Sequence, residues 1–252
     1  MIKIVVSGCN GAMGRMLTEV IEATEDTEIV AGIDRNLNVC DNKYPVYELP
    51  SLIKEQCDVI IDFSNPSNIS SLIEYAVNNN IALVIATTGF NDDEENKIKE
   101  ASKYTRIFKS SNMSLGVNVL INLVKQATSV LGDTFDIEII EKHHNKKVDA
   151  PSGTAKMIAN SINTELNNSM EFNYGRQGTD AKRKSNEIGI HAVRGGTISG
   201  EHTVLFAGLD EVIEIKHMAL SKRIFAQGAV EAAKYVLDKE NGLYDMDNLI
   251  NN

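Results

Sequence analysis

Short apolar runs alternate with apolar residues at helical spacing over the first part of the chain. The run 2–6 is rich in β-branched residues, and the segment after it carries apolar residues at helical spacing between residues 16 and 21. Further strands are expected over residues 28–33, 59–63, 82–86 and 106–109, with helices over residues 67–77 and 92–104. This alternation predicts an α/β domain with a Rossmann-like, doubly wound parallel sheet.

The pattern changes near Leu115. A helix is expected over residues 116–131, a strand over 135–142 and a helix over 152–166. Strands over 188–194, 200–207 and 211–218 follow, separated by glycine-containing turns at 195–196 and 208–210. These strands predict a smaller α+β domain with an open, mixed or mostly antiparallel sheet, one face of which helices or another subunit must cover.

The last helix, expected over residues 225–237, has small residues suited to close packing, and we assign it to the first domain. The predicted organisation is a dinucleotide-binding domain of residues 1–114 and 222–252, and a substrate-binding and oligomerisation domain of residues 115–221.

A glycine-rich turn joins the first strand to the first helix. Gly8, Gly11 and Gly14 have the spacing G-x-x-G-x-x-G, a variant of the dinucleotide fingerprint G-x-G-x-x-G. Glycines there permit a tight turn, close approach of the backbone to a pyrophosphate and close packing of the helix on the sheet. The strand, turn and helix together predict a nicotinamide dinucleotide site.

The second strand ends in an acid followed by a base. Asp34 stands twenty residues after Gly14, where a carboxylate can accept hydrogen bonds from the ribose 2′-hydroxyl of NADH. Arg35 follows directly and suits the 2′-phosphate of NADPH. The pair predicts tolerance of both cofactors and leaves the preference between them open.

Polar turns also follow two later strands. Thr87-Thr88-Gly89-Phe90 and Ser110-Ser111-Asn112-Met113 are expected at the carboxyl edge of the sheet, where ligands bind in such folds. Since these residue types favour turns in any case, a purely structural role is the alternative for both segments.

Composition narrows the function classes. The 252 residues carry a net charge of −10, no Trp and only 6% aromatic residues, so neither the basic surface nor the stacking aromatics of a nucleic-acid-binding protein are present. Against this acidic background the basic segment 142–147 stands out as a local attractor for anions.

The cysteines and the first residues of the chain indicate whether disulfide bonds, a metal site or membrane insertion are expected. Cys9, Cys40 and Cys57 are odd in number and lack C-x-x-C spacing, so neither a disulfide framework nor a metal site is expected. The chain enters a strand at once, and no apolar run approaches the roughly 18 residues of a membrane span. A cytoplasmic protein that does not bind membranes is expected.

The segment 141–155, Glu-Lys-His-His-Asn-Lys-Lys-Val-Asp-Ala-Pro-Ser-Gly-Thr-Ala, gathers proton donors and cations before a helix. Ser152 is a natural N-cap, and Gly153 and Thr154 would offer backbone N–H groups to a carboxylate. His143, His144 and Lys147 can hydrogen-bond an anion, and histidine exchanges protons most readily near neutral pH. The segment predicts a site for a small anionic substrate, with a solvated loop as the alternative.

These motifs together resemble the 4-hydroxy-tetrahydrodipicolinate reductase family, historically called dihydrodipicolinate reductase. The string His-His-x-x-Lys-x-Asp-x-Pro-Ser-Gly-Thr-Ala is specific, and the resemblance runs nearly end to end. Its elements lie at residues 8–15, 87–90, 112–118, 143–155, 191–195 and 200–204, and at Phe225, Gly228 and Ala229.

The resemblance implies an NAD(P)H-dependent oxidoreductase of bacterial diaminopimelate and lysine synthesis, which assembles as a homotetramer through its second domain. It implies that His143 is the catalytic proton donor or acceptor, that Lys147 is a second proton donor, and that the substrate's carboxylates bind His144, Gly153 and Thr154. The cofactor contacts that it implies are Gly8, Cys9, Asn10, Gly11, Ala12, Met13, Asp34, Arg35, Ala86, Thr87, Thr88, Ser110, Ser111, Asn112 and Met113.

Three positions depart from the family pattern: Ala86 replaces a frequent glycine, Met113 a common aromatic residue, and Lys222 an arginine of some members. Two other readings stay open. A sugar or semialdehyde dehydrogenase would need another catalytic set, such as a nucleophilic cysteine, and Cys40 and Cys57 lack the surrounding signals. A non-catalytic nucleotide sensor should have lost His143 or Lys147, and both are present.

Overall fold

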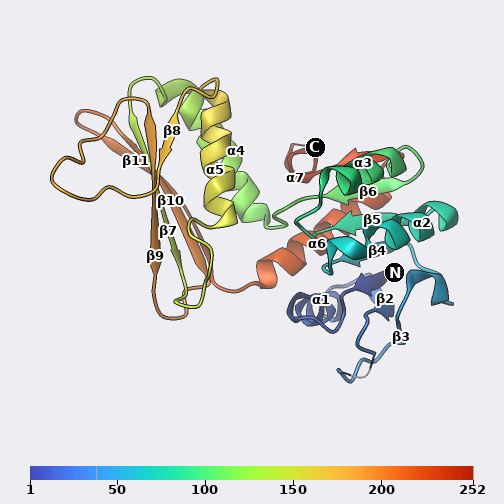
Figure 1. Ribbon diagram of the computed structural model, residues 1–252. Coiled ribbons are helices and arrows are strands. Elements are labelled where there is room, and N and C mark those ends of the chain that lie inside the picture. The colour runs from blue at the N-terminus through green and yellow to red at the C-terminus, as the bar shows by residue number, and fades with distance from the viewer. Residues whose placement is uncertain (38, 252) are drawn as a thin grey trace. The chain divides into compact units, whose positions relative to one another are not determined.

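The computed structural model describes residues 1–37 and 39–251, and this part of the chain divides into two compact units. Unit 1 comprises Met1–Leu115 and Lys222–Asn252, and unit 2 comprises Gly116–Ser221. Each unit has its own sheet (Figure 1). Each also has its own hydrophobic core.

Unit 1 is built on a parallel sheet whose strands run in the order β12-β6-β5-β4-β1-β2-β3. The strands are β1 (Ile2–Ser7), β2 (Thr27–Ile33), β3 (Val46–Tyr47), β4 (Val59–Asp62), β5 (Ala82–Ile85), β6 (Arg106–Lys109) and β12 (Gly242–Tyr244). The chain turns to one side of β1 to form β2 and to the other side to form β4. Since ligands of such sheets bind where the strand order reverses, the carboxyl ends of β1 and β4 are the expected binding edge.

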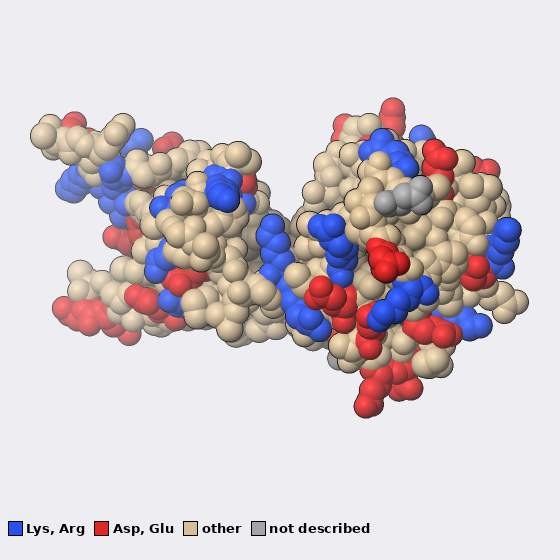
Figure 2. Space-filling view, turned by 90° about the horizontal axis from the view of Figure 1, so that it is seen from below, with Lys and Arg blue, Asp and Glu red and all other residues tan. Residues whose placement is uncertain are grey.

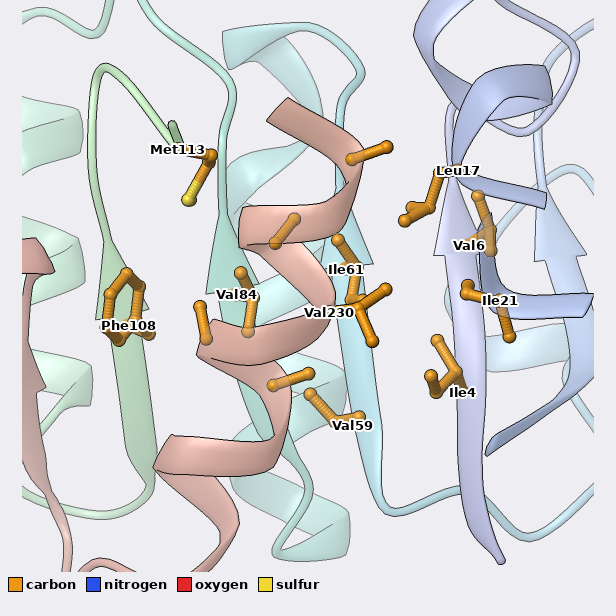
Figure 3. Close-up of a cluster of buried hydrophobic side chains, with 14 of the residues drawn as sticks. Ile4, Val6, Leu17, Ile21, Val59, Ile61, Val84, Phe108, Met113 and Val230 are labelled. Carbon is orange, nitrogen blue, oxygen red and sulfur yellow. The ribbon is translucent and has the colours of Figure 1, made fainter. Parts of the chain in front are cut away.

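Helices cover both faces of this sheet because its central strands are apolar on both sides. One face packs against α1 (Ala12–Glu22), α6 (Arg223–Leu237) and α7 (Met246–Ile250). Figure 3 shows Val230 of α6 lying among Ile4, Ile61 and Ile21, which belong to β1, β4 and α1. The other face packs against α2 (Ile69–Asn79) and α3 (Asp92–Ala101), and the short 3-10 helices are η1 (Pro50–Leu52) and η2 (Pro66–Asn68).

Unit 2 has a sheet with the strand order β11-β10-β7-β9-β8. Its strands are β7 (Asp136–His143), β8 (Glu171–Asn173), β9 (Glu187–Arg194), β10 (Gly200–Ala207) and β11 (Val212–Ala219). The helices α4 (Leu115–Leu131) and α5 (Gly153–Glu165) pack on one face of this sheet and form its hydrophobic core. The expected fold class, a Rossmann-like sheet with a smaller α+β part, is confirmed.

The sheet of unit 2 is mixed, so the first of the two expected sheet types is confirmed and the mostly antiparallel one is not. β7 and β8 each pair with β9 in parallel, whereas β10 pairs antiparallel with β7 and with β11. After β7 the chain crosses through α5, and β8 and β9 then run in the same direction as β7, as in a βαβ unit. The turn at Gly195 and Gly196 does not close a hairpin, because β7 lies between β9 and β10.

Several short elements lacked a clear sequence signal, namely β3, β8, β12, η1 and α7. Within the described residues, no helix combines the length and apolar character needed to cross a bilayer. On the face in Figure 2, basic and acidic side chains are interspersed over the surface of each unit.

Candidate active site

The predicted cofactor residues lie at the carboxyl edge of the unit 1 sheet. Residues 8–13 follow β1, Asp34 and Arg35 follow β2, residues 86–88 follow β5 and residues 110–113 follow β6. Strands that run in parallel end at the same edge, so four segments far apart in the sequence meet there.

The glycine loop tests whether a dinucleotide fits this edge. Gly8 has φ +79°, and a Cβ on it would stand 2.5 Å from the carbonyl oxygen of Phe63 at the end of β4. A Cβ on Gly14 would stand 2.1 Å from the carbonyl oxygen of Gly8. Both distances exclude any side chain, so the glycines let α1 start directly under the loop and leave its backbone exposed. These are the conditions for pyrophosphate at a helix N-terminus.

Asp34, the predicted ribose-binding residue, holds the loop. Its carboxylate accepts the backbone N–H of Asn10 at 3.0 Å and that of Asn36 at 2.9 Å. The side chain of Asn10 donates in turn to the carbonyl oxygen of Asn36. A substitution of Asp34 would therefore affect the shape of the loop.

A pocket of about 250 Å³ opens beside these residues within unit 1. Gly8, Gly11, Asp34 and Arg35 line one part of it, and Leu49, Pro50, Asn65 and Asn68 are among the other residues that line it. Its mixed polar and apolar walls suit the adenosine end of a dinucleotide. Asn65 and Asn68 precede α2 and were not predicted as cofactor residues.

The segment after β5 is fixed by a buried carboxylate. Asp62, the last residue of β4, accepts hydrogen bonds at 2.6 Å from the hydroxyls of Ser64 and Thr87, and the Thr87 oxygen accepts the N–H of Ser64 at 2.9 Å. Burial, which outweighs these hydrogen bonds, raises the pKa of Asp62. The Thr87 side chain is thus committed to the fold, whereas Ala86 is half-buried and Thr88 is exposed.

The segment after β6 folds back on itself before α4. Ser110 donates its hydroxyl to the carbonyl oxygen of Asn112 at 2.9 Å, and the Asn112 side chain accepts the N–H of Ser114 at 2.9 Å. Met113 is buried in the core of unit 1 (Figure 3), while Ser111 is exposed. The Met113 side chain therefore packs inward.

Cys9 likewise points into the core beneath the glycine loop, and burial raises the pKa of its thiol to about 12. Met13 packs partly against the same core, whereas Ala12 is exposed. Any cofactor contact of Cys9 must therefore come from its backbone.

In unit 2, His143 is the last residue of β7 and faces the side covered by the helices, as does Glu141 two residues earlier. His143 is only 8% exposed, and its Nδ1 lies 2.7 Å from Oε2 of Glu141. Burial, the largest influence, raises the pKa of Glu141, but hydrogen bonds from Arg194, His143 and the Ser152 N–H outweigh it and lower that pKa overall. The lowered pKa keeps the carboxylate ionised at neutral pH, and an ionised carboxylate can accept a hydrogen bond from Nδ1 of His143.

The same carboxylate also fixes the start of α5. Oε1 of Glu141 accepts the N–H of Ser152 at 2.9 Å, and the Ser152 hydroxyl caps α5 by accepting the N–H of Ala155 at 3.1 Å. Gly153 begins the helix, and a Cβ there would meet no atom within 4 Å. The structure thus links His143 to the helix start that carries Gly153 and Thr154.

Lys147 lies in the loop between β7 and α5. Its Nζ forms a 2.8 Å ion pair with Asp149, and the hydrogen bond from Lys147 lowers the pKa of Asp149. The Lys147 N–H donates to the carbonyl oxygen of His144 at 3.2 Å, and His144 is half-buried. All five predicted catalytic and substrate residues therefore come from one segment at the carboxyl end of β7.

Lys142 does not belong to this cluster, so the basic segment 142–147 is smaller than expected. Its side chain lies on the opposite face of the sheet and contacts Glu201 at 2.6 Å. Because side chains alternate along a strand, residues 141 and 143 share one face and Lys142 takes the other.

Glu141, Arg194 and His202 have no role predicted from the sequence, yet the structure places them around His143 and Ser152. Arg194 donates to both Glu141 oxygens at 2.7 Å, and His202 contacts the Ser152 hydroxyl through Nε2 at 3.0 Å. Burial, and to a smaller extent the nearby His143, lower the pKa of His202 to about 4, so His202 is neutral at neutral pH. The segments 191–195 and 200–204 were noted as family elements, which was the only signal for Arg194 and His202.

Comparison with known proteins decides the family. Residues 2–113 match the family model described as dihydrodipicolinate reductase, N-terminus, and residues 116–250 match the model described as its C-terminus. This chain belongs to the dihydrodipicolinate reductase family. The resemblance read from the motifs is confirmed, and the chain is an oxidoreductase of that family.

Full-length relatives of the chain have names that agree with this family. The chain is 51% identical over 250 residues to the 4-hydroxy-tetrahydrodipicolinate reductase of Caldanaerobacter subterraneus subsp. tengcongensis, covering 99% of this chain and 98% of the relative. It is 48% identical over 251 residues to the protein of the same name from Clostridium tetani, covering 100% and 98%. A dipicolinate-bound dihydrodipicolinate reductase from Paenisporosarcina sp. TG-14 has the same fold, with a TM-score of 0.81, 23% identity and 97% coverage of both chains.

Proposed function

We propose that this chain reduces 4-hydroxy-tetrahydrodipicolinate, via dihydrodipicolinate, to tetrahydrodipicolinate in diaminopimelate and lysine synthesis, using NADH or NADPH. The observation that carries the proposal is the buried His143–Glu141 pair beside Lys147 and the start of α5. Family membership and the names of the full-length relatives support the same reaction.

His143 is the proton donor in this proposal. The nicotinamide, when bound, supplies a hydride to the conjugated imine of the substrate. The electron-rich enamine that results must take up a proton, and a positioned acid both supplies it and stabilises the developing charge. His143 meets this need because Glu141 fixes its ring, and Lys147 provides a second proton donor in the same segment.

His144, Gly153 and Thr154 hold the substrate's carboxylates. The first-turn amides of α5 point along the helix axis and favour an anion, and Ser152 fixes where that helix begins. The Paenisporosarcina protein with the same fold was solved with dipicolinate, which supports a small dicarboxylate as the ligand class.

The cofactor residues are those at the carboxyl edge of the unit 1 sheet. Backbone groups of residues 8–13 bind the pyrophosphate, and Asp34 and Arg35 meet the ribose of NADH and the 2′-phosphate of NADPH respectively. Residues 86–88 and 110–113 contact the nicotinamide half. The inward packing of Cys9 and Met113 means that these two residues contribute through their backbone.

The deciding experiment generates the substrate in situ from pyruvate and aspartate semialdehyde with the preceding synthase and follows NADH or NADPH oxidation by absorbance. Oxidation that requires the synthase supports the reaction and ranks the two cofactors. Synthase-independent oxidation, or binding of nucleotide without oxidation, counts against it and favours a different dehydrogenase or a nucleotide sensor.

We also propose a cytoplasmic homotetramer. The support for assembly is the face of the unit 2 sheet opposite α4 and α5, where Val193, Val212 and Met218 are each about half exposed. Sedimentation velocity of the wild type and of Met218→Glu tests this: a tetramer that the substitution weakens is expected, and a monomeric wild type refutes it.

A further inference from the structure

The environment of His143 includes a carboxylate whose position depends on a residue of another strand. Glu141 is fully buried, and the register of the parallel β7–β9 pair places Arg194 directly beside His143. Nη1 and Nη2 of Arg194 donate to Oε2 and Oε1 of Glu141, each at 2.7 Å. This bidentate contact holds the carboxylate in one orientation.

Arg194 is itself anchored to the backbone on both sides. Nη1 donates to the carbonyl oxygen of Val193 at 2.8 Å, and Nη2 donates to that of Asp149 at 2.7 Å. The guanidinium therefore connects β9, the loop that carries Lys147, and the Glu141 carboxylate.

We propose that Glu141 and Arg194 are positioning residues for His143: Arg194 orients the Glu141 carboxylate, which holds Nδ1–H of the imidazole so that Nε2 is the atom that exchanges the catalytic proton. This inference rests on the proposed function, in which His143 is the proton donor. In that function Glu141 fixes the imidazole ring, whereas Arg194 has no role and the proton-exchanging nitrogen is not specified.

Gly200 completes the arrangement. A Cβ on Gly200, the first residue of β10, would stand 3.1 Å from Nε2 of His143, closer than such contacts normally come. The absence of a side chain at this position leaves Nε2 uncovered from that direction. Gly200→Ala should therefore reduce turnover without changing the bond between His143 and Glu141.

The charge around His143 is balanced in the native protein. Glu141 and the His202 ring contact His143 directly, and Arg194 binds Glu141. In the following loop, Lys147 acts electrostatically on His202 and Asp149 on Arg194. Replacing Glu141 by Gln removes the negative charge and leaves the Arg194 guanidinium uncompensated. The protonated form of His143 then becomes less favourable.

The test compares pH profiles of kcat for the wild type, Glu141→Gln, the double variant Glu141→Gln with Arg194→Met, and Glu138→Gln. Glu138 is a matched control because it lies on β7 but faces the other side of the sheet, where it contacts His191 at 2.7 Å and Arg176. Both single substitutions thus remove one carboxylate that binds a histidine and an arginine.

For Glu141→Gln we expect kcat to fall about 10- to 100-fold. The alkaline limb of its kcat–pH profile should move to lower pH by about one unit or more. The substrate KM should change little, because a Gln oxygen can still accept the Ser152 N–H. The double variant should return the limb toward that of the wild type, since it also removes the uncompensated cation. Glu138→Gln should leave the limb in place.

A measurement on the wild type keeps the proposal testable if Glu141→Gln does not fold. The protein has five histidines, so ring ¹⁵N signals of labelled histidine can be assigned, with that of His143 identified by its loss in His143→Gln. At high pH, where the ring is neutral, the proton should reside on Nδ1. In Glu141→Gln, whose amide N–H₂ donates to Nδ1, it should move to Nε2.

An Nε2–H tautomer in the wild type, or a Glu141→Gln profile that superimposes on the wild-type profile, would overturn the positioning role. Failure of the proposed function looks different: His143→Gln would then keep its turnover, or no synthase-dependent oxidation would occur, while the tautomer still reports whether Glu141 holds Nδ1.

Discussion

Replacing His143 by Gln should lower both the turnover number and the unfolding free energy, and the two losses can be estimated separately. Gln cannot donate a proton as imidazolium does, and a positioned general acid contributes about 10²- to 10⁴-fold to rate. The expected loss in kcat corresponds to about 3 to 5 kcal/mol of transition-state stabilisation. Affinity for NADH or NADPH should stay nearly unchanged, because the predicted nucleotide contacts all belong to unit 1.

The stability cost of His143→Gln is smaller and has a separate origin. The substitution removes the 2.7 Å bond to the Glu141 carboxylate, and a hydrogen bond to a charged group contributes about 1.5 to 3 kcal/mol. It also removes the edge-to-face contact with the His202 ring, whose centroid lies 5.3 Å away. Since Arg194 and the Ser152 N–H still bind Glu141, the unfolding free energy should fall by about 2 to 3 kcal/mol.

His191→Gln is the control for this experiment. His191 contacts Glu138 at the same 2.7 Å but lies on the other face of the sheet. Stopped-flow oxidation gives turnover, fluorescence titration gives nucleotide affinity, and urea unfolding gives stability for both variants. Turnover of His143→Gln close to that of the wild type, or a similar loss in His191→Gln, would refute the assignment of His143 as the acid.

Four further substitutions or conditions test other parts of the structure. Lys147→Ala should lower kcat and raise the substrate KM in steady-state assays, and unchanged values of both would count against its role. Asp34→Asn should weaken binding of NADH more than of NADPH by titration, because it removes the charge proposed to bind the ribose hydroxyls, and equal losses would place Asp34 away from the ribose. Gly14→Ala should weaken both nucleotides at least tenfold, since its methyl group would stand 2.1 Å from a backbone oxygen, and calorimetric titration with normal affinity would contradict the close packing of α1. The pKa of His202 is lowered to about 4 from the usual 6.5, so the unfolded chain binds a proton at this residue more readily than the folded protein does. The unfolding free energy should therefore fall by up to about 3 kcal/mol as the pH drops from 6.5 to 4. If a His202→Gln variant shows the same pH dependence in urea unfolding, His202 is not the cause of that dependence.

The sequence by itself determined the features that depend on neighbouring residues. The period-two and helical patterns located the main strands and helices, and the glycine loop identified the strand, turn and helix that a dinucleotide needs. The string from His143 to Ala155 sufficed for the family, because the residues that define it are contiguous. Local patterning fixes such features since backbone conformation responds mainly to nearby side chains.

Only the tertiary structure decided which distant residues meet. Alternation of apolar and polar residues indicates that a strand has two different faces, but it identifies neither the strand that pairs with it nor the register of the pairing. For that reason the sequence could not show that β7 separates β9 from β10, that Lys142 faces away from His143, or that Arg194 lies beside Glu141. The buried carboxylate that orients His143 depends on this strand order, because its charge is tolerated only where a cation from another strand compensates it.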